Sequence, residues 1–200
     1  MSKYVPNKMM KNSRYKDFLL RLNDTEKRKI IDKISVLISE NQKYCDKGNY
    51  KHLCNIFTSF AIYQMLLEQG NSKEQAFEVV STEMWKYVEK GAGIYRKLFP
   101  KGKMLKFMGK MLPKMFAKGS GYGWKYTWHT DTATNDYLKF ECNECIYAKI
   151  FTKYNVPELG PMFCHADDIN YGQIPGIKFT RNHTLCKDGQ DCDFLFERVK

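Results

Sequence analysis

Apolar residues recur at helical spacing through the first part of the chain. One segment begins at Asp24 or Thr25 and carries Ile30, Ile34 and Leu37 on a single face. A second helix is predicted from about Tyr50 to Gln69, and Gly70 ends it. A short helix is also predicted over residues 15–22. The pattern therefore indicates a helical beginning.

Two more helices follow in the predicted order. Ser72 and Gln75 have the spacing of a capping box, so a helix is expected from there to Gly91. Pro100 and Gly102 then separate a short helix from a lysine- and methionine-rich one over residues 103–118. We therefore predict that residues 1–118 are all-helical.

The pattern changes to a two-residue alternation after Gly119. Residues 124–129 and 137–142 alternate apolar and polar side chains, which predicts two strands joined by the polar run 130–136. Helices are expected over 144–154 and 161–170. Two further strands are predicted over 177–184 and 191–199, with a turn at 187–189 between them.

The order strand-strand-helix-helix-strand-strand predicts an α+β fold. Hairpins at both ends favour a four-stranded antiparallel sheet with helices on one face. The helical part, residues 1–118, is expected to pack on the α+β part, residues 119–200, as one compact domain. The mean hydropathy is −0.55, and the start Met1–Met10 is polar and lysine-bearing, so we expect a cytoplasmic protein.

Positive charge is concentrated away from the predicted sheet. The chain has a formal net charge of +11, and residues 94–118 contain eight basic residues and no acidic one. A solvated lysine-rich face explains this most simply, and peripheral membrane contact through 94–118 is the alternative. Nucleic acid is not an expected partner, because no recognised nucleic-acid-binding motif accompanies the charge. The oligomeric state is not predicted.

Reactive side chains gather after residue 140. Cys142 and Cys145 form a Cys-x-x-Cys where a strand becomes a helix, and Cys145 is expected in the first helical turn. The next helix carries Cys164 and Asp167. Further candidates, on or at the start of the last two strands, are Arg181, Cys192 and Asp193.

Three interpretations of these groups remain open. The first is a thiol nucleophile with a carboxylate for proton transfer and an arginine for an anionic substrate. The second is a zinc site built from Cys142, Cys145, Cys164 and Cys192, although one Cys-x-x-Cys without a partner knuckle is a limited signal. The third is that cysteines fill the core as small apolar residues. Core packing is the interpretation we adopt for Cys45, Cys54 and Cys186, and it is favoured for Cys142.

The last third of the chain resembles the L-2-amino-thiazoline-4-carboxylic acid hydrolase family. The residues that carry the resemblance are, in order, Cys145, Pro157-Glu158-Leu159, Phe163-Cys164-His165-Ala166-Asp167, Phe179-x-Arg181, Thr184-Leu185, Gly189 and Cys192-Asp193-Phe194-x-Phe196. Cys186 departs from the family pattern, which usually has an alanine there. The same order of elements is similar to 4-vinyl-reductase-type and TRAPP-subunit-like domains, which implies a non-catalytic pocket for a small or lipidic ligand as the alternative function.

The family resemblance implies a hydrolase that opens a cyclic amidine carboxylate to N-carbamoyl-cysteine without a cofactor. It implies that Cys145 or Cys164 attacks the C2 carbon, or activates the site by hydrogen bonding. Asp167 would orient or deprotonate water, and Arg181 would pair with the substrate carboxylate. Asp193 would contact the amino group, and Cys192 would line the pocket.

Overall fold

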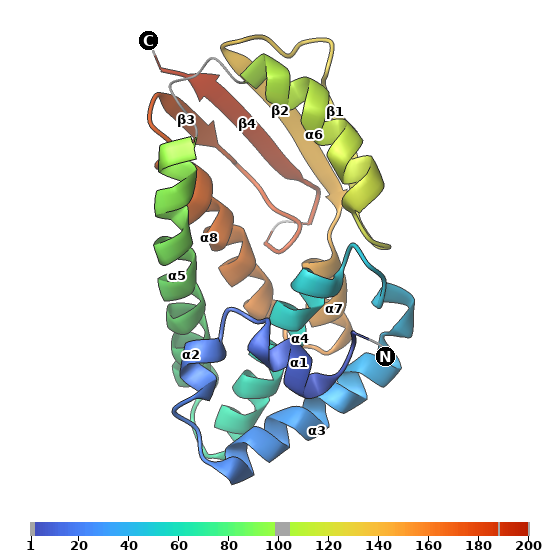
Figure 1. Cartoon of the computed structure of the whole chain (residues 1–200), viewed down its shortest axis with the longest axis vertical. Helices are drawn as coiled ribbons and strands as arrows, with labels where there is room; N and C mark the ends of the chain where they lie inside the picture. The colour runs from blue at the N-terminus through green and yellow to red at the C-terminus, as the bar shows by residue number, and fades with distance from the viewer. Residues whose placement is uncertain (1–2, 99–104, 188, 200) are drawn as a thin grey trace. The chain divides into compact units, whose positions relative to one another are not determined.

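The computed structural model describes residues 3–98, 105–187 and 189–199, and in the helix that ends at Leu98 it describes side chains as far as residue 93 (Figure 1). The chain divides into two compact units, Met1–Tyr87 and Val88–Lys200. The division falls inside one long helix, so we describe each unit by itself.

The first unit is built from helices. They are α1 (Pro6–Lys11), α2 (Lys16–Leu19), α3 (Asp24–Glu40), η1 (Gln42–Tyr44), α4 (Tyr50–Glu68) and the first part of α5 (Lys73–Leu98). A capping box between Asn23 and Glu26 begins α3, and Gly70, with φ of +89°, lies just past the end of α4. Helix α4 is buried on nearly all sides, and its Leu53, Phe57 and Phe60 form the centre of this unit.

The capping box predicted at Ser72 is confirmed, but the predicted end of that helix is wrong. Ser72 and Gln75 exchange hydrogen bonds of 2.9 and 3.2 Å, and α5 then continues through Gly91 and Gly93 to Leu98. A glycine inside a helix costs only about 1 kcal/mol relative to alanine, so continued helical bonding on both sides outweighs it. The predicted break at Pro100 and Gly102 lies outside the described residues.

The second unit confirms the α+β prediction. After α6 (Leu105–Gly119) come β1 (Lys125–Trp128), β2 (Tyr137–Glu144), α7 (Ile146–Lys153), η2 (Pro157–Leu159), α8 (Gly160–Tyr171), β3 (Ile177–Thr180) and β4 (Cys192–Arg198). The strands form a sheet of order β1-β2-β4-β3 in which every neighbouring pair is antiparallel.

Two predicted boundaries need correction, and both affect the site. Strand β3 ends at Thr180 rather than at 184, because the Asp193 carboxylate accepts hydrogen bonds from the backbone amides of Asn182 and His183. Arg181 therefore lies in the loop after β3. Cys145 is the N-cap of α7 with an extended backbone, one residue before the first helical turn.

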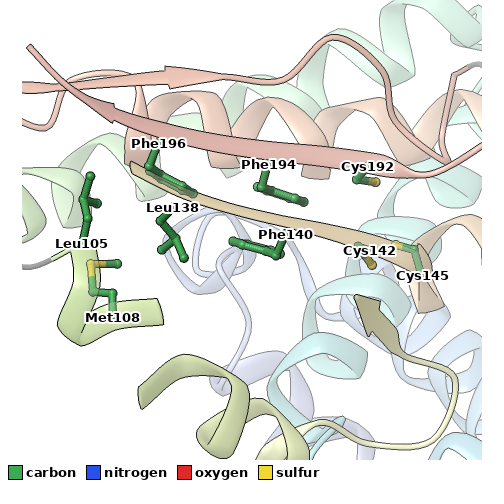
Figure 2. Close-up of a cluster of buried hydrophobic side chains, with 9 residues drawn as sticks. All are labelled: Leu105, Met108, Leu138, Phe140, Cys142, Cys145, Cys192, Phe194 and Phe196. Atoms are coloured by element: carbon green, nitrogen blue, oxygen red, sulfur yellow. The ribbon is translucent and has the colours of Figure 1, made fainter. Parts of the chain in front are cut away.

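A single face of the sheet carries the hydrophobic core of this unit. Leu138, Phe140 and Cys142 alternate inward along β2, and directly opposite them on β4 are Phe196, Phe194 and Cys192. Figure 2 shows that phenylalanines and Leu138 occupy one stretch of the two strands and the cysteines the other. Phe140 and Phe194 stack with ring centroids 4.7 Å apart. The hydrophobic core of this unit therefore extends to the side chains of Cys142, Cys145 and Cys192.

Helix α6 covers this face with its apolar side. Leu105 and Met108 are buried against the sheet core, so this part of the methionine-rich stripe has a structural role. The outer side carries the exposed residues Lys106, Lys110, Lys114, Phe107 and Met115. None of the described helices is both long and apolar enough to cross a membrane. Peripheral membrane contact through 94–118 stays a prediction, and residues 99–104 of that segment lie outside the described part.

The close approach of α6 to the sheet generates a stability prediction. A Cβ at Gly109 would stand 2.7 Å from the Ala133 Cβ, whereas one at Gly93 in α5 would meet nothing within 4 Å. We expect Gly109→Ala to lower the free energy of unfolding by about 1–3 kcal/mol through overpacking. Gly93→Ala, with the same helix-propensity gain and no clash, is expected to be neutral or stabilising by up to about 1 kcal/mol. Urea titrations followed by circular dichroism measure both, and equal effects would show that the α6 packing is not as close as described.

Candidate functional site

Three thiols from different elements meet beside the beginnings of α7 and α8. Cys145 is the N-cap of α7, and Cys164 lies in the second turn of α8. Cys186 comes from the loop between β3 and β4 and lies against Gly160, the first residue of α8. A Cβ at Gly160 would be 2.8 Å from the Cys186 sulfur, so a glycine is required for this approach. We call Cys145, Cys164 and Cys186 the thiol group.

Cys186 is the central member of the thiol group. Its side chain hydrogen-bonds with both Cys145 and Cys164. These hydrogen bonds, together with burial, raise the pKa of Cys186, so this thiol keeps its proton. A thiol carries one proton and donates to one partner at a time. The negative charge therefore belongs on a neighbouring sulfur.

Cys164 is the sulfur whose surroundings favour the thiolate. The hydrogen bond from Cys186 is the largest influence, and with the Arg181 charge it outweighs burial and lowers the pKa of Cys164 to about 7. Cysteine reactivity follows the thiolate fraction, and about half of such a thiol is ionised near neutral pH. Burial instead raises the pKa of Cys54 to about 11, so that thiol stays protonated.

Arg181 connects the loop after β3 to α8. Its Nη2 donates to the Cys164 carbonyl oxygen at 2.9 Å and to Asp168 Oδ1 at 2.7 Å, and its Nη1 lies 3.3 Å from Asp167 Oδ2. The guanidinium also stands over the rings of Phe179 and Phe194 at 5.8 and 5.6 Å. With 5% of its side chain exposed, Arg181 is a buried cation held by this chain's own groups.

The loop that presents Cys186 is fixed at both ends. At its start, the Asp193 carboxylate accepts from the His183 amide at 2.9 Å and from the Asn182 amide and side chain at 2.8 Å. Although burial alone would raise the pKa of Asp193, these bonds lower it. The Leu185 amide then donates to the Cys192 sulfur at 3.4 Å, and the Thr184 carbonyl accepts from the Lys187 amide at 3.0 Å.

Cys142 and Cys192 form a second, separate thiol pair. They face each other across β2 and β4, and their side chains hydrogen-bond. That bond, with burial, raises the pKa of Cys142, and it lowers the pKa of Cys192 despite burial. Both are buried, in keeping with the packing role predicted for Cys142.

A cavity of about 280 Å³ opens at the thiol group. Its lining residues come from α7, from the start of η2 and from the loop between β3 and β4: Ala148, Phe151, Thr152, Pro157, Leu185, Cys186, Lys187 and Gly189. This volume is slightly below the roughly 300–1,000 Å³ of pockets for drug-sized ligands, which suits a smaller molecule. Cys186 is the member of the thiol group in its wall, and Cys164 lies behind it.

The structure thus brings the predicted side chains together in part. Cys145 and Cys164 meet through Cys186, and Asp167 joins them through Arg181. Cys192 and Asp193 hold the loop that carries Cys186. The six residues predicted from the sequence, which are Cys145, Cys164, Asp167, Arg181, Cys192 and Asp193, are all absent from the described lining of the cavity. Within the described ranges, no three His, Cys, Asp or Glu side chains are arranged to hold a metal ion.

Sequence reasoning missed the residues nearest the cavity. It assigned Cys186 to core packing and gave Lys187 no role, yet both residues line the cavity. These residues lie in an irregular loop, where no periodicity reports which side chain points inward. The one available signal was another cysteine six residues before Cys192, in a chain where five of the seven cysteines lie after residue 140.

The electrostatics of the thiol group predict the pH dependence of alkylation. Because the pKa of Cys164 is lowered to about 7, its rate of reaction with iodoacetamide should rise through pH 7 and level off above about pH 8. Cys186→Ala removes the hydrogen bond that lowers the Cys164 pKa most, so the midpoint should move to higher pH. Peptide mass spectrometry follows each site, with Cys54 as the internal control. A Cys164 midpoint near 9 would contradict this description.

Comparison with known proteins gives one informative match. The family model described as L-2-amino-thiazoline-4-carboxylic acid hydrolase matches residues 50–196, from the start of α4 almost to the end of β4. Searches of curated proteins and of solved structures found no significant match. The matched segment includes the whole thiol group, Arg181 and the cavity. This chain belongs to the L-2-amino-thiazoline-4-carboxylic acid hydrolase family.

Proposed function

We propose that this protein is a hydrolase that opens a small cyclic amidine carboxylate of the 2-amino-thiazoline-4-carboxylate type, giving N-carbamoyl-cysteine. The observation that carries the proposal is a thiol with a pKa of about 7, Cys164, hydrogen-bonded to a protonated thiol in a cavity wall. The family assignment supports the reaction class. Both the nucleophile and its proton donor are sulfur atoms in this proposal.

The first step uses Cys164 as the nucleophile. Because Cys186 and not Cys164 lines the cavity, the Cys186 side chain turns aside as the substrate enters. The Cys164 thiolate then attacks the C2 carbon of the ring, and a bond forms between that carbon and the Cys164 sulfur. The bond between C2 and the ring sulfur breaks, and the ring sulfur takes the proton of Cys186. The enzyme then carries an open isothiourea on Cys164, and Cys186 holds the negative charge.

The second step uses water and restores both thiols. Water attacks the same carbon and gives a proton to the Cys186 thiolate, which now serves as the base. The bond to Cys164 breaks and the thiolate of Cys164 returns. The other water proton passes to the nitrogen that was in the ring, so the carbon leaves as the carbonyl of a urea. Asp167, which is 35% exposed beside Arg181, is the carboxylate that orients the water.

The surrounding groups support this use of charge. Cys145 begins α7, where unpaired amides and the helix dipole favour negative charge. The Arg181 cation favours negative charge on Cys164 in both steps. In both steps the negative charge moves only between sulfur atoms that already lie close together.

The proposal predicts that the protein hydrolyses the thiazoline acid and that substitution of Cys164 abolishes this activity. Purified protein should convert L-2-amino-thiazoline-4-carboxylate to N-carbamoyl-cysteine, detected by mass spectrometry and by release of a titratable thiol. Cys164→Ser should lower kcat by at least about 10³-fold, since removing a catalytic nucleophile costs this much or more. Cys45→Ser, a change in the other unit, is the control and should keep full activity.

Retained folding distinguishes loss of chemistry from loss of structure. Both variants should keep the wild-type circular dichroism spectrum and melting temperature within a few degrees. Full activity in folded Cys164→Ser protein would exclude Cys164 as the nucleophile. Tight binding of the acid by the wild-type protein without any product would instead indicate a ligand-binding domain.

A further inference from the structure

We infer that Lys187 is the residue that binds the carboxylate of the substrate in the cavity beside Cys186, and that it selects acids over uncharged cyclic amidines. The inference rests on the proposed function and deepens it, because it assigns the specificity of the same site. Lys187 does not belong to the motifs by which the sequence resembles the hydrolase family. The assignment comes from the lining of the cavity and from the positions of the other cations nearby.

One described residue in the lining of the cavity carries a positive charge that can bind an anion. Leu185, Phe151, Ala148 and Pro157 are apolar, Gly189 has no side chain, and Thr152 and Cys186 are uncharged. Among the described lining residues, Lys187 is the one with a formal charge. Among the side chains of the described lining, the Lys187 ammonium is therefore the group that can neutralise a carboxylate entering the cavity.

Two other cations of this region, Arg181 and Lys149, are engaged elsewhere. Arg181 binds Asp167, Asp168 and the Cys164 carbonyl, and it is almost fully buried. Lys149 on α7 forms an ion pair with Glu144. Recruiting Arg181 to a substrate would leave two carboxylates beside Cys164 without their cation, which disfavours the thiolate. We therefore assign to Lys187 the binding of the substrate carboxylate, which the resemblance implied for Arg181.

The backbone places Lys187 next to the reacting sulfur atoms. The Thr184 carbonyl accepts from the amides of both Lys187 and Gly189, at 3.0 and 3.4 Å, which holds this turn in a defined shape. Gly189 adopts φ of +82°, a conformation that strains other residues. Lys187 follows Cys186 directly in the chain. In the substrate, the carbon that bears the carboxylate is separated from C2 by one ring nitrogen, so both groups are within reach of neighbouring residues.

The test compares binding of an acid and its uncharged analogue. Cys164→Ser protein, which is expected to bind without turnover, is titrated calorimetrically with L-2-amino-thiazoline-4-carboxylate and with 2-amino-thiazoline, which lacks the carboxylate. Adding Lys187→Gln should weaken binding of the acid by about 10–100-fold, the range of one charge-assisted hydrogen bond. Binding of the uncharged analogue should change less than about threefold.

Matched variants separate a specific role from a general loss of positive charge. Lys178→Gln on β3 removes the same charge from an exposed strand position and should leave both affinities unchanged. Lys187→Arg should retain most of the affinity for the acid. In the turnover assay with Cys164 intact, Lys187→Gln should raise KM for the acid with kcat within about threefold.

The possible results distinguish this inference from the proposed function. Equal affinities of the acid for the Lys187→Gln and parent proteins would overturn the role of Lys187, whether or not the enzyme is active. An equal loss for the acid and the uncharged analogue would also overturn it, since that result indicates a damaged cavity. A protein that binds the acid through Lys187 but yields no product would retain the carboxylate site and refute the hydrolase.

Discussion

The contact of Cys186 with the first residue of α8 is the constraint on which the site depends. Because Gly160 has no side chain, the loop between β3 and β4 comes close enough for Cys186 to hydrogen-bond with Cys145 and Cys164. That hydrogen bond is the largest influence on the Cys164 pKa. A larger residue at position 160 would separate the sulfur atoms, and both the stabilised thiolate and the cavity wall would be lost. The loop therefore determines the chemistry as much as the helices do.

Most of the described charged groups near the site are paired with each other and hold the structure, and one is left for binding a substrate. The buried Arg181 binds the partly exposed Asp167 and Asp168 and links the loop to α8, and its charge favours the thiolate of Cys164. Asp193 and Cys192 fix the start of the same loop through its amides. With these groups satisfied internally, recognition of a small anion is assigned to Lys187 at the cavity. Internally paired groups around Cys164 and one cation, Lys187, at the cavity are consistent with a selective site for a small acid.

Regular structure was predictable from the sequence because periodicity follows burial. The helices around Ile34 and Phe57 and the strand of Leu138 and Phe140 were found from their apolar spacing, and the α+β class followed from the element order. The length of β3 was not predictable, because a side chain distant in sequence, Asp193, takes the amides that would extend the strand. Convergence of Cys145 and Cys164 was expected from the resemblance, but their link through Cys186 depends on Gly160, which no local pattern reveals.

The central claim is that the thiolate of Cys164 attacks the substrate and carries it covalently. Rapid mixing of the wild-type protein with L-2-amino-thiazoline-4-carboxylate, followed by acid quench and peptide mass spectrometry, measures this directly. The account predicts a transient adduct whose mass equals that of the whole substrate, attached to the peptide that contains Cys164. An adduct on Cys145 or Cys186, or turnover with no enzyme-bound species at any quench time, would contradict it.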